Sequence, residues 1–157
     1  MVQDRLRDGT RIAQLVASEL TGDRNALQQV VVVDADPDVE PTEDGALAYR
    51  VALVSEPEAV DVGERGQTTV DETVGADQTV LGSVFVHPER ARIEFTVAPD
   101  AAAETAQSVE LRSRPKAVDP PQTLVFVEDG AEAKRVMAVF KSVVGTVDEP
   151  AGSTDPK

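Results

Sequence analysis

Residues 80–97 read VLGSVFVHPERARIEFTV, and this stretch decides the fold. In its second half, apolar side chains alternate with charged or polar ones, which is the period of a strand that buries one face. His87-Pro88-Glu89 interrupts the apolar pattern, and proline is typical of turns because its ring presets the backbone. The stretch therefore predicts a β-hairpin whose two strands are residues 80–86 and 91–97. We expect His87 to face water in this turn, in a structural rather than a catalytic role.

One helix and two strands are predicted upstream of the hairpin. Apolar residues recur at helical spacing over residues 2–20, and Gly9 moves the expected start toward Thr10, because glycine weakens a helix by roughly 1 kcal/mol relative to alanine. Residues 30–33 are four consecutive valines and predict a short buried strand. Residues 46–54 alternate in polarity and predict a second strand with one face on the core.

Three further elements are predicted downstream of the hairpin. We expect Asp100 to cap an alanine-rich helix over residues 100–111, because its carboxylate can accept the free amide protons of the first turn. Three prolines keep residues 112–121 extended, as a rigid crossover or, alternatively, a recognition ledge. Residues 123–127 predict a strand, and the final helix is expected to stop at Gly145.

This order of elements defines the fold class. Helix, four strands, helix, strand and helix predict an α+β two-layer sandwich, with a mostly antiparallel sheet of about five strands and three helices on one face. A single domain is expected over residues 1–145. Residues 56–78 hold seven acids and one arginine, and this composition predicts a disordered loop insertion. Residues 146–157 are expected to form a disordered tail.

The charge balance predicts the solvent in which the protein works. Twenty-nine acidic residues oppose fifteen basic ones, so the formal net charge is -14. Such a chain repels itself in dilute buffer, whereas at about 1 M salt the screening length falls to roughly 3 Å. We therefore expect a halophilic protein with an acidic surface. The longest apolar run, residues 136–140, is far shorter than the ~20 residues of a membrane span, so we expect a cytoplasmic protein with no membrane contact.

Composition also excludes several kinds of site. The chain has no cysteine, which excludes disulfides, a thiolate nucleophile, iron–sulfur clusters and cysteine zinc sites. His87 is the single histidine, so no histidine cluster can hold a metal. The apolar residues are mainly valine and alanine, which bury less surface each than leucine or phenylalanine. Stability is therefore expected to depend on salt.

Acidic residues after two predicted strands form the first candidate site. Asp34 and Asp36 follow the strand at 30–33, and Glu128 and Asp129 follow the strand at 123–127. If these strands were parallel neighbours, the four carboxylates would converge and could hold Mg²⁺, as in haloacid-dehalogenase-type phosphatases. The chain departs from that family, because it lacks the alternation of strands and helices. A solvated acidic turn is the favoured interpretation of residues 34–38.

Basic residues form the second candidate site. Arg112, Arg114 and Lys116 alternate along an extended segment and so share one side. Arg90 and Arg92 do the same in the hairpin. Were the two segments adjacent, they would form a cationic surface able to bind a phosphate, a carboxylate or an RNA backbone. The favoured alternative is pairing with local acids such as Glu94 and Glu110. The scarcity of aromatic residues disfavours a nucleic-acid ligand.

Four stretches carry a resemblance to a known family: residues 4–9 with 11–15, residues 33–37, residues 87–92, and residues 114–118 with 120–121. Together they resemble an uncharacterised family of small acidic proteins from haloarchaea. The resemblance covers most of the chain outside residues 56–78 and the tail. It implies an archaeal, halophilic origin and no particular activity, so no catalytic residue follows from it.

Two hypotheses of function follow from these residues. The first is a non-enzymatic binding or interaction module that needs no cofactor. Its contact surface would be the cationic residues, and its partner an unidentified protein or a small anionic ligand. The alternative is a divalent-metal-dependent phosphohydrolase that holds Mg²⁺ with Asp34, Asp36, Glu128 and Asp129.

Overall fold

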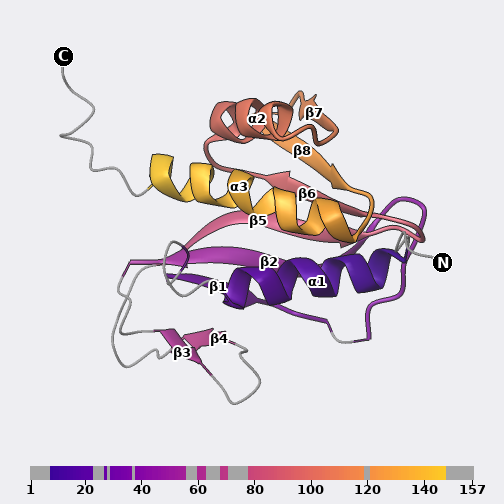
Figure 1. The fold of residues 1–157 in the computed structure, drawn as a ribbon. Coiled ribbons are helices and arrows are strands. Elements are labelled where there is room, and N and C mark those ends of the chain that lie inside the picture. Colours follow the sequence, from indigo (N-terminus) through magenta and orange to yellow (C-terminus); the bar gives the residue numbers. More distant parts are fainter. Residues whose placement is uncertain are drawn as a thin grey trace.

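A computed structural model describes residues 8–22, 27, 29–36, 38–55, 60–62, 68–70, 78–118 and 121–147. Three helices and a six-stranded sheet form an α+β fold of two layers, with the helices on one face of the sheet (Figure 1). The helices are α1 (Gly9–Gly22), α2 (Pro99–Ser108) and α3 (Gly130–Val147). The strands of the sheet are β1 (Val30–Val33), β2 (Ala46–Val54), β5 (Gln78–Val86), β6 (Ala91–Phe95), β7 (Ser113–Lys116) and β8 (Gln122–Val127).

The sheet is antiparallel throughout. Its strand order is β1-β2-β5-β6-β8-β7, so β1 and β7 are the two edges. The hairpin predicted from residues 80–97 is present, because β5 pairs with β6 from Gly82 opposite Phe95 to Val86 opposite Ala91. After β6 the chain crosses through α2 to the edge strand β7 and returns as β8, which inserts between β6 and β7.

Alternating burial explains why the helices lie on one face. On β6, Ala91, Ile93 and Phe95 are fully buried, whereas Arg92 and Glu94 are only half-buried. The buried set packs against the helices, and Phe95 meets Phe140 of α3 with 5.0 Å between ring centroids. The half-buried set points to the opposite side, which we call the open face of the sheet.

Helix α1 is fixed to the sheet by a phenol and by a glycine. The hydroxyl of Tyr49, on β2, donates a hydrogen bond of 2.7 Å to the carbonyl of Ala13, and burial raises the pKa of this phenol. At the helix start, a Cβ on Gly9 would lie 1.8 Å from the carbonyl oxygen of His87. Glycine therefore lets α1 approach the turn of the β5–β6 hairpin more closely than any other residue could.

Several predicted boundaries differ from the structure. Helix α1 begins at Gly9 with Asp8 as its cap, since one Asp8 carboxylate oxygen accepts the amide protons of Thr10 and Arg11. Helix α2 begins at Pro99, so Asp100 lies inside its first turn and is not the cap. Proline suits the first helical position because its missing amide proton would have no partner there. Strand β6 ends at Phe95, two residues early, and α3 passes Gly145 to end at Val147.

The sheet has six strands rather than about five, because residues 113–116 form β7 within the predicted crossover. Pro115 is compatible with a strand here since β7 is an edge, where one side needs no ladder hydrogen bonds. Two short strands, β3 (Val60–Val62) and β4 (Thr68–Val70), form a separate ladder inside the range predicted to be a disordered insertion. The other residues of 56–77 lie outside the described residues, as do residues 148–157 of the predicted tail.

The short ladder lies on the open face near the β1 edge. Strand β4 contacts β1 on the side opposite α1 (Figure 1). A small second cluster is buried on that side, formed by Val31, Ala52 and Val54 with Val33 packed against it. The open face is therefore apolar and covered near β1, and polar over β6, β8 and β7. None of the helices among the described residues has the length and apolar character needed to cross a bilayer.

Candidate functional site

The predicted basic residues lie on the polar part of the open face. We call Arg90, Arg92, Arg112, Arg114 and Lys116 the cationic strip. Directly opposed residues in an antiparallel pair share a face. Arg92 lies opposite Phe126, while Arg114 and Lys116 lie opposite Leu124 and Gln122 of the same strand. The two groups of cations are therefore on one face, but they are separated by β8 rather than adjacent, because β8 lies between β6 and β7.

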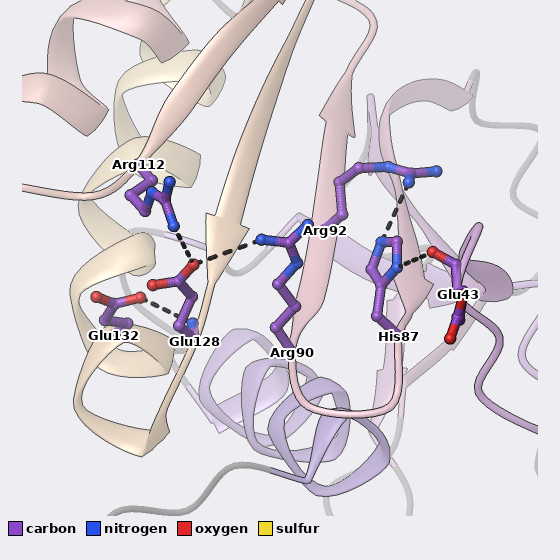
Figure 2. A network of polar contacts seen from close by, with 7 residues as sticks. All are labelled: Glu43, His87, Arg90, Arg92, Arg112, Glu128 and Glu132. Carbon is purple, nitrogen blue, oxygen red and sulfur yellow. Dashed lines mark hydrogen bonds and ion pairs between the residues drawn. The ribbon is translucent and has the colours of Figure 1, made fainter.

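The two groups are joined across β8 by Glu128. Oε2 of this carboxylate lies 3.1 Å from Nη1 of Arg112 and 3.6 Å from Nη1 of Arg90 (Figure 2). Arg112 comes from the segment before β7 and Arg90 from the hairpin turn, so one carboxylate binds a cation from each side. Ion pairing with a local acid was the favoured prediction for these arginines, and Glu128 is the acid for both.

Glu94 makes the same kind of bridge further along the strip. Its two carboxylate oxygens lie 3.0 Å from Nη2 of Arg92 and 3.2 Å from Nζ of Lys116. The prediction named Glu94 as a local acid, and the structure confirms this pairing. The other predicted acid, Glu110, is exposed, and the structure gives no ion pair for it among the described residues.

Exposure differs between the two signs of charge. The side chain of Glu94 is 13 % exposed, against 16 % for Arg92 and 40 % for Lys116. That of Glu128 is 32 % exposed, against 39 % for Arg90 and 71 % for Arg112. Each carboxylate is shared by two cations, and Arg114 is exposed with no side-chain partner among the described residues. The five cations of the strip and the two acids that bridge them together carry a net charge of +3, on a chain whose net charge is -14.

Two phenylalanine rings support Arg90 of the hairpin turn and Arg92 of β6. The guanidinium carbon of Arg90 lies 4.5 Å from the centroid of Phe126, and that of Arg92 lies 4.5 Å from the centroid of Phe85. Stacking on an aromatic face is favourable by about 0.5–1 kcal/mol at exposed sites and restricts the guanidinium plane. Phe85 and Phe126 were not predicted as part of the site, although alternation along the hairpin places Phe85 on the same face as Arg92.

Arg92 also holds the one histidine. Its Nη1 lies 3.1 Å from Nε2 of His87 and donates to the carbonyl of Asp44, also over 3.1 Å. Because a guanidinium only donates, Nε2 must accept, so the proton of His87 is on Nδ1 and is donated to the carbonyl of Glu43 over 3.0 Å (Figure 2). His87 is only 7 % exposed, so the prediction that it faces water is wrong.

An open cleft of about 610 Å³ adjoins one end of the cationic strip. It is formed where the hairpin turn, the end of β8 and the start of α3 meet. Its lining residues are Glu43, His87, Pro88, Glu89, Arg90, Arg112, Glu128, Asp129 and Glu132. The cations in this lining are Arg90 and Arg112, which both belong to the strip, and most of the other lining side chains are acidic.

The acids at the start of α3 have structural partners. Asp129 accepts the amide proton of Glu132 over 2.9 Å, and the Glu132 carboxylate accepts the amide proton of Glu128 over 2.8 Å. Asp129 thus caps the N-terminus of α3, and Glu132 joins the first turn of this helix to the end of β8. Burial raises the pKa of Glu132, and the nearby Asp129 and Glu128 carboxylates raise it further.

The other two predicted metal ligands lie elsewhere. Asp34 and Asp36 are exposed beyond the end of β1, where Asp34 pairs with Arg50 at 3.1 Å and Asp36 accepts the amide proton of Asp38. Strands β1 and β8 run in the same direction, but β2, β5 and β6 lie between them. Four spacings of about 4.8 Å separate the two strands by about 19 Å.

The structure thus does not bring the two predicted acidic pairs together, because the strands that carry them are not neighbours. One Mg²⁺ with ligand bonds of about 2.0–2.1 Å could not be shared across that separation. Within the part of the chain that the structure describes, no cluster of three or more histidine, aspartate or glutamate side chains is arranged to hold a metal ion.

The fold and the site together define a class: a two-layer α+β domain with a cationic strip on the open face of an antiparallel sheet. Comparison with protein-family models matches residues 1–156 to a family of unknown function, DUF7993. The chain belongs to this family. Comparison with curated proteins finds no match, and neither does comparison with solved structures.

Proposed function

We propose that this chain is a non-enzymatic binding module whose contact surface is the cationic strip and whose partner is anionic. One observation carries the proposal. Glu94 and Glu128 are each shared by two cations and are less exposed than most of those cations, so the strip presents unneutralised positive charge to solvent. Guanidinium groups bind carboxylates and phosphates through several N–H donors at once, and Arg112 uses few of its donors within the chain.

The arrangement of the cleft supports binding rather than catalysis. Three titratable groups that line it, His87, Asp129 and Glu132, are each held in hydrogen bonds to the chain's own backbone. A general base must instead reach a substrate proton. These groups therefore have structural roles, and the neighbouring arginines make the contact with the partner.

Calorimetric titration with tripolyphosphate, a small multivalent anion, tests the proposal. We expect saturable binding that is lost in the double variant Arg112→Glu with Arg114→Glu. Lys134→Glu with Lys141→Glu is the matched control, because it makes the same change of charge at exposed positions of α3 and should retain binding. Equal loss in both double variants would indicate a diffuse effect of net charge and would overturn the proposal.

A further inference from the structure

The cations on β7 and just before it form a row with a fixed repeat. The row consists of Arg112, Arg114 and Lys116, each two residues from the next. Alternate residues of a strand repeat every ~6.6–6.8 Å. All three side chains are on the open face, because each lies opposite Phe126, Leu124 or Gln122 of β8. An extended polypeptide has the same repeat between alternate side chains, so carboxylates at every second residue would match the row.

We propose that the partner is an acidic polypeptide segment that binds in extended conformation, with alternate carboxylates on Arg112, Arg114 and Lys116. This inference rests on the function proposed above and names the chemistry of the partner. Leu124 of β8 lies opposite Arg114 on one side and opposite Glu94 on the other, so its side chain provides an apolar contact surface beside the row. The negative charge of the partner is complementary to the positive charge of the strip. The repeat of its alternate carboxylates matches the spacing of the three cations.

The backbone of β7 favours contact through side chains over addition of a strand. The carbonyl of Arg112 accepts the amide proton of Phe126, so residues 112, 114 and 116 direct their backbone groups toward β8. Residues 113 and 115 direct theirs to the free edge. Pro115 has no amide proton, so a strand added at this edge would lose one of its few hydrogen bonds. The partner is therefore placed on the face and not at the edge.

The aromatic residues distinguish this partner from a single-stranded nucleic acid. Nucleic-acid binders of that class stack bases on exposed aromatic rings. On this face, Phe126 and Phe85 are already covered by the guanidinium groups of Arg90 and Arg92. The rings are occupied by charges of the chain itself, which leaves the cations as the groups that contact a ligand.

Fluorescence anisotropy with two labelled peptides of equal composition tests the inference. One is acetyl-Glu-Thr-Glu-Thr-Glu-Thr-amide, which alternates, and the other is acetyl-Glu-Glu-Glu-Thr-Thr-Thr-amide. We expect the alternating peptide to bind at least about fivefold more tightly, because only its carboxylates match all three cations. Arg114→Gln should remove most of this preference. Arg11→Gln, the same change at an exposed position of α1, should leave it intact.

Each remaining outcome contradicts the inference in a different way. Tripolyphosphate binding without peptide binding would overturn the acidic-peptide partner and leave the proposed function standing. Tighter binding of an oligothymidylate than of the alternating peptide would assign the strip to nucleic acid. Sedimentation that shows self-association, abolished by Arg112→Glu with Arg114→Glu, would assign it to a second copy of the chain. Failure of every anion, tripolyphosphate included, would overturn the proposed function itself.

Discussion

The amide of Gly9 donates a hydrogen bond of 3.1 Å to the carbonyl of Pro88, which joins the first turn of α1 to the turn of the β5–β6 hairpin. These residues are about eighty positions apart, so the contact joins two segments that are distant in the sequence. Both segments are among those that carry the family resemblance. The contact gives a physical reason for a glycine at the start of a helix, where glycine is otherwise unfavourable.

Replacement of this glycine provides the first prediction. Gly9→Ala would place a Cβ against the His87 carbonyl, and we expect the free energy of unfolding to fall by about 2 kcal/mol or more. Gly145→Ala is the matched control, since it lies within α3 with no atom within 4 Å of the added Cβ. That variant should gain about 0.5–1 kcal/mol. Urea denaturation at fixed salt measures both, and a gain of stability in Gly9→Ala would refute the close approach.

The second prediction separates the capping role of Asp129 from a metal-binding role. Asp129→Ala should lower the free energy of unfolding by about 1 kcal/mol, because the amide of Glu132 loses its acceptor. Asp129→Asn should lower the free energy of unfolding by only roughly a few tenths of a kcal/mol, since asparagine is an equally good cap. Thermal or urea unfolding compares the two variants in the presence of a chelator. Equal losses in both would argue against the cap.

The third prediction concerns pH. Burial lowers the pKa of His87 in the folded chain below its ordinary value of 6.5, and the positive charges of Arg92 and Arg90 lower it further. The unfolded chain therefore binds this proton more tightly than the folded chain does. The contribution of the neutral imidazole to the free energy of unfolding is fully present above pH 6.5 and is lost as pH falls through the folded pKa. We expect His87→Asn to be less stable overall but to have a shallower decrease over this range. Identical slopes in the two proteins would contradict the neutral, buried imidazole.

The fourth prediction concerns salt. The net charge of -14 should make the folded chain repel itself, and the screening length falls from about 10 Å at 0.1 M to about 3 Å at 1 M. We therefore expect the urea midpoint to rise steadily with KCl over that range. Sodium and potassium chloride should act alike if screening is the cause. A midpoint independent of salt would show that the acidic surplus has another role.

The sequence predicted those parts of the fold that local periodicity determines. Alternation in residues 91–95 indicated both the strand and its buried face, and the β5–β6 hairpin was confirmed with its turn at residues 87–89. The prediction missed the strand β7, because Pro115 and the two later prolines indicated a crossover. Proline within an extended segment is also typical of an edge strand, so the signal was present.

The arrangement of the site depended on strand order, which local patterns do not reveal. Arg90 and Arg112 share one carboxylate because β8 inserts between β6 and β7 and places Glu128 within reach of both. The acidic pairs that would have shared a metal are kept apart by β2, β5 and β6, which lie between β1 and β8. The cap formed by Asp129 and Glu132 could have been predicted, because acidic residues three apart before an apolar helix are a capping signature.

The most direct test of the central claim is a map of where an anion binds. We predict that titration with the alternating peptide shifts the backbone amide resonances of β7, β8 and the start of β6, in a saturable way and with one dissociation constant. Resonances of α1 and of the outer surface of α3 should not move. Shifts confined to residues 129–132, or spread evenly over the chain without saturation, would contradict the assignment of the cationic strip as the binding surface.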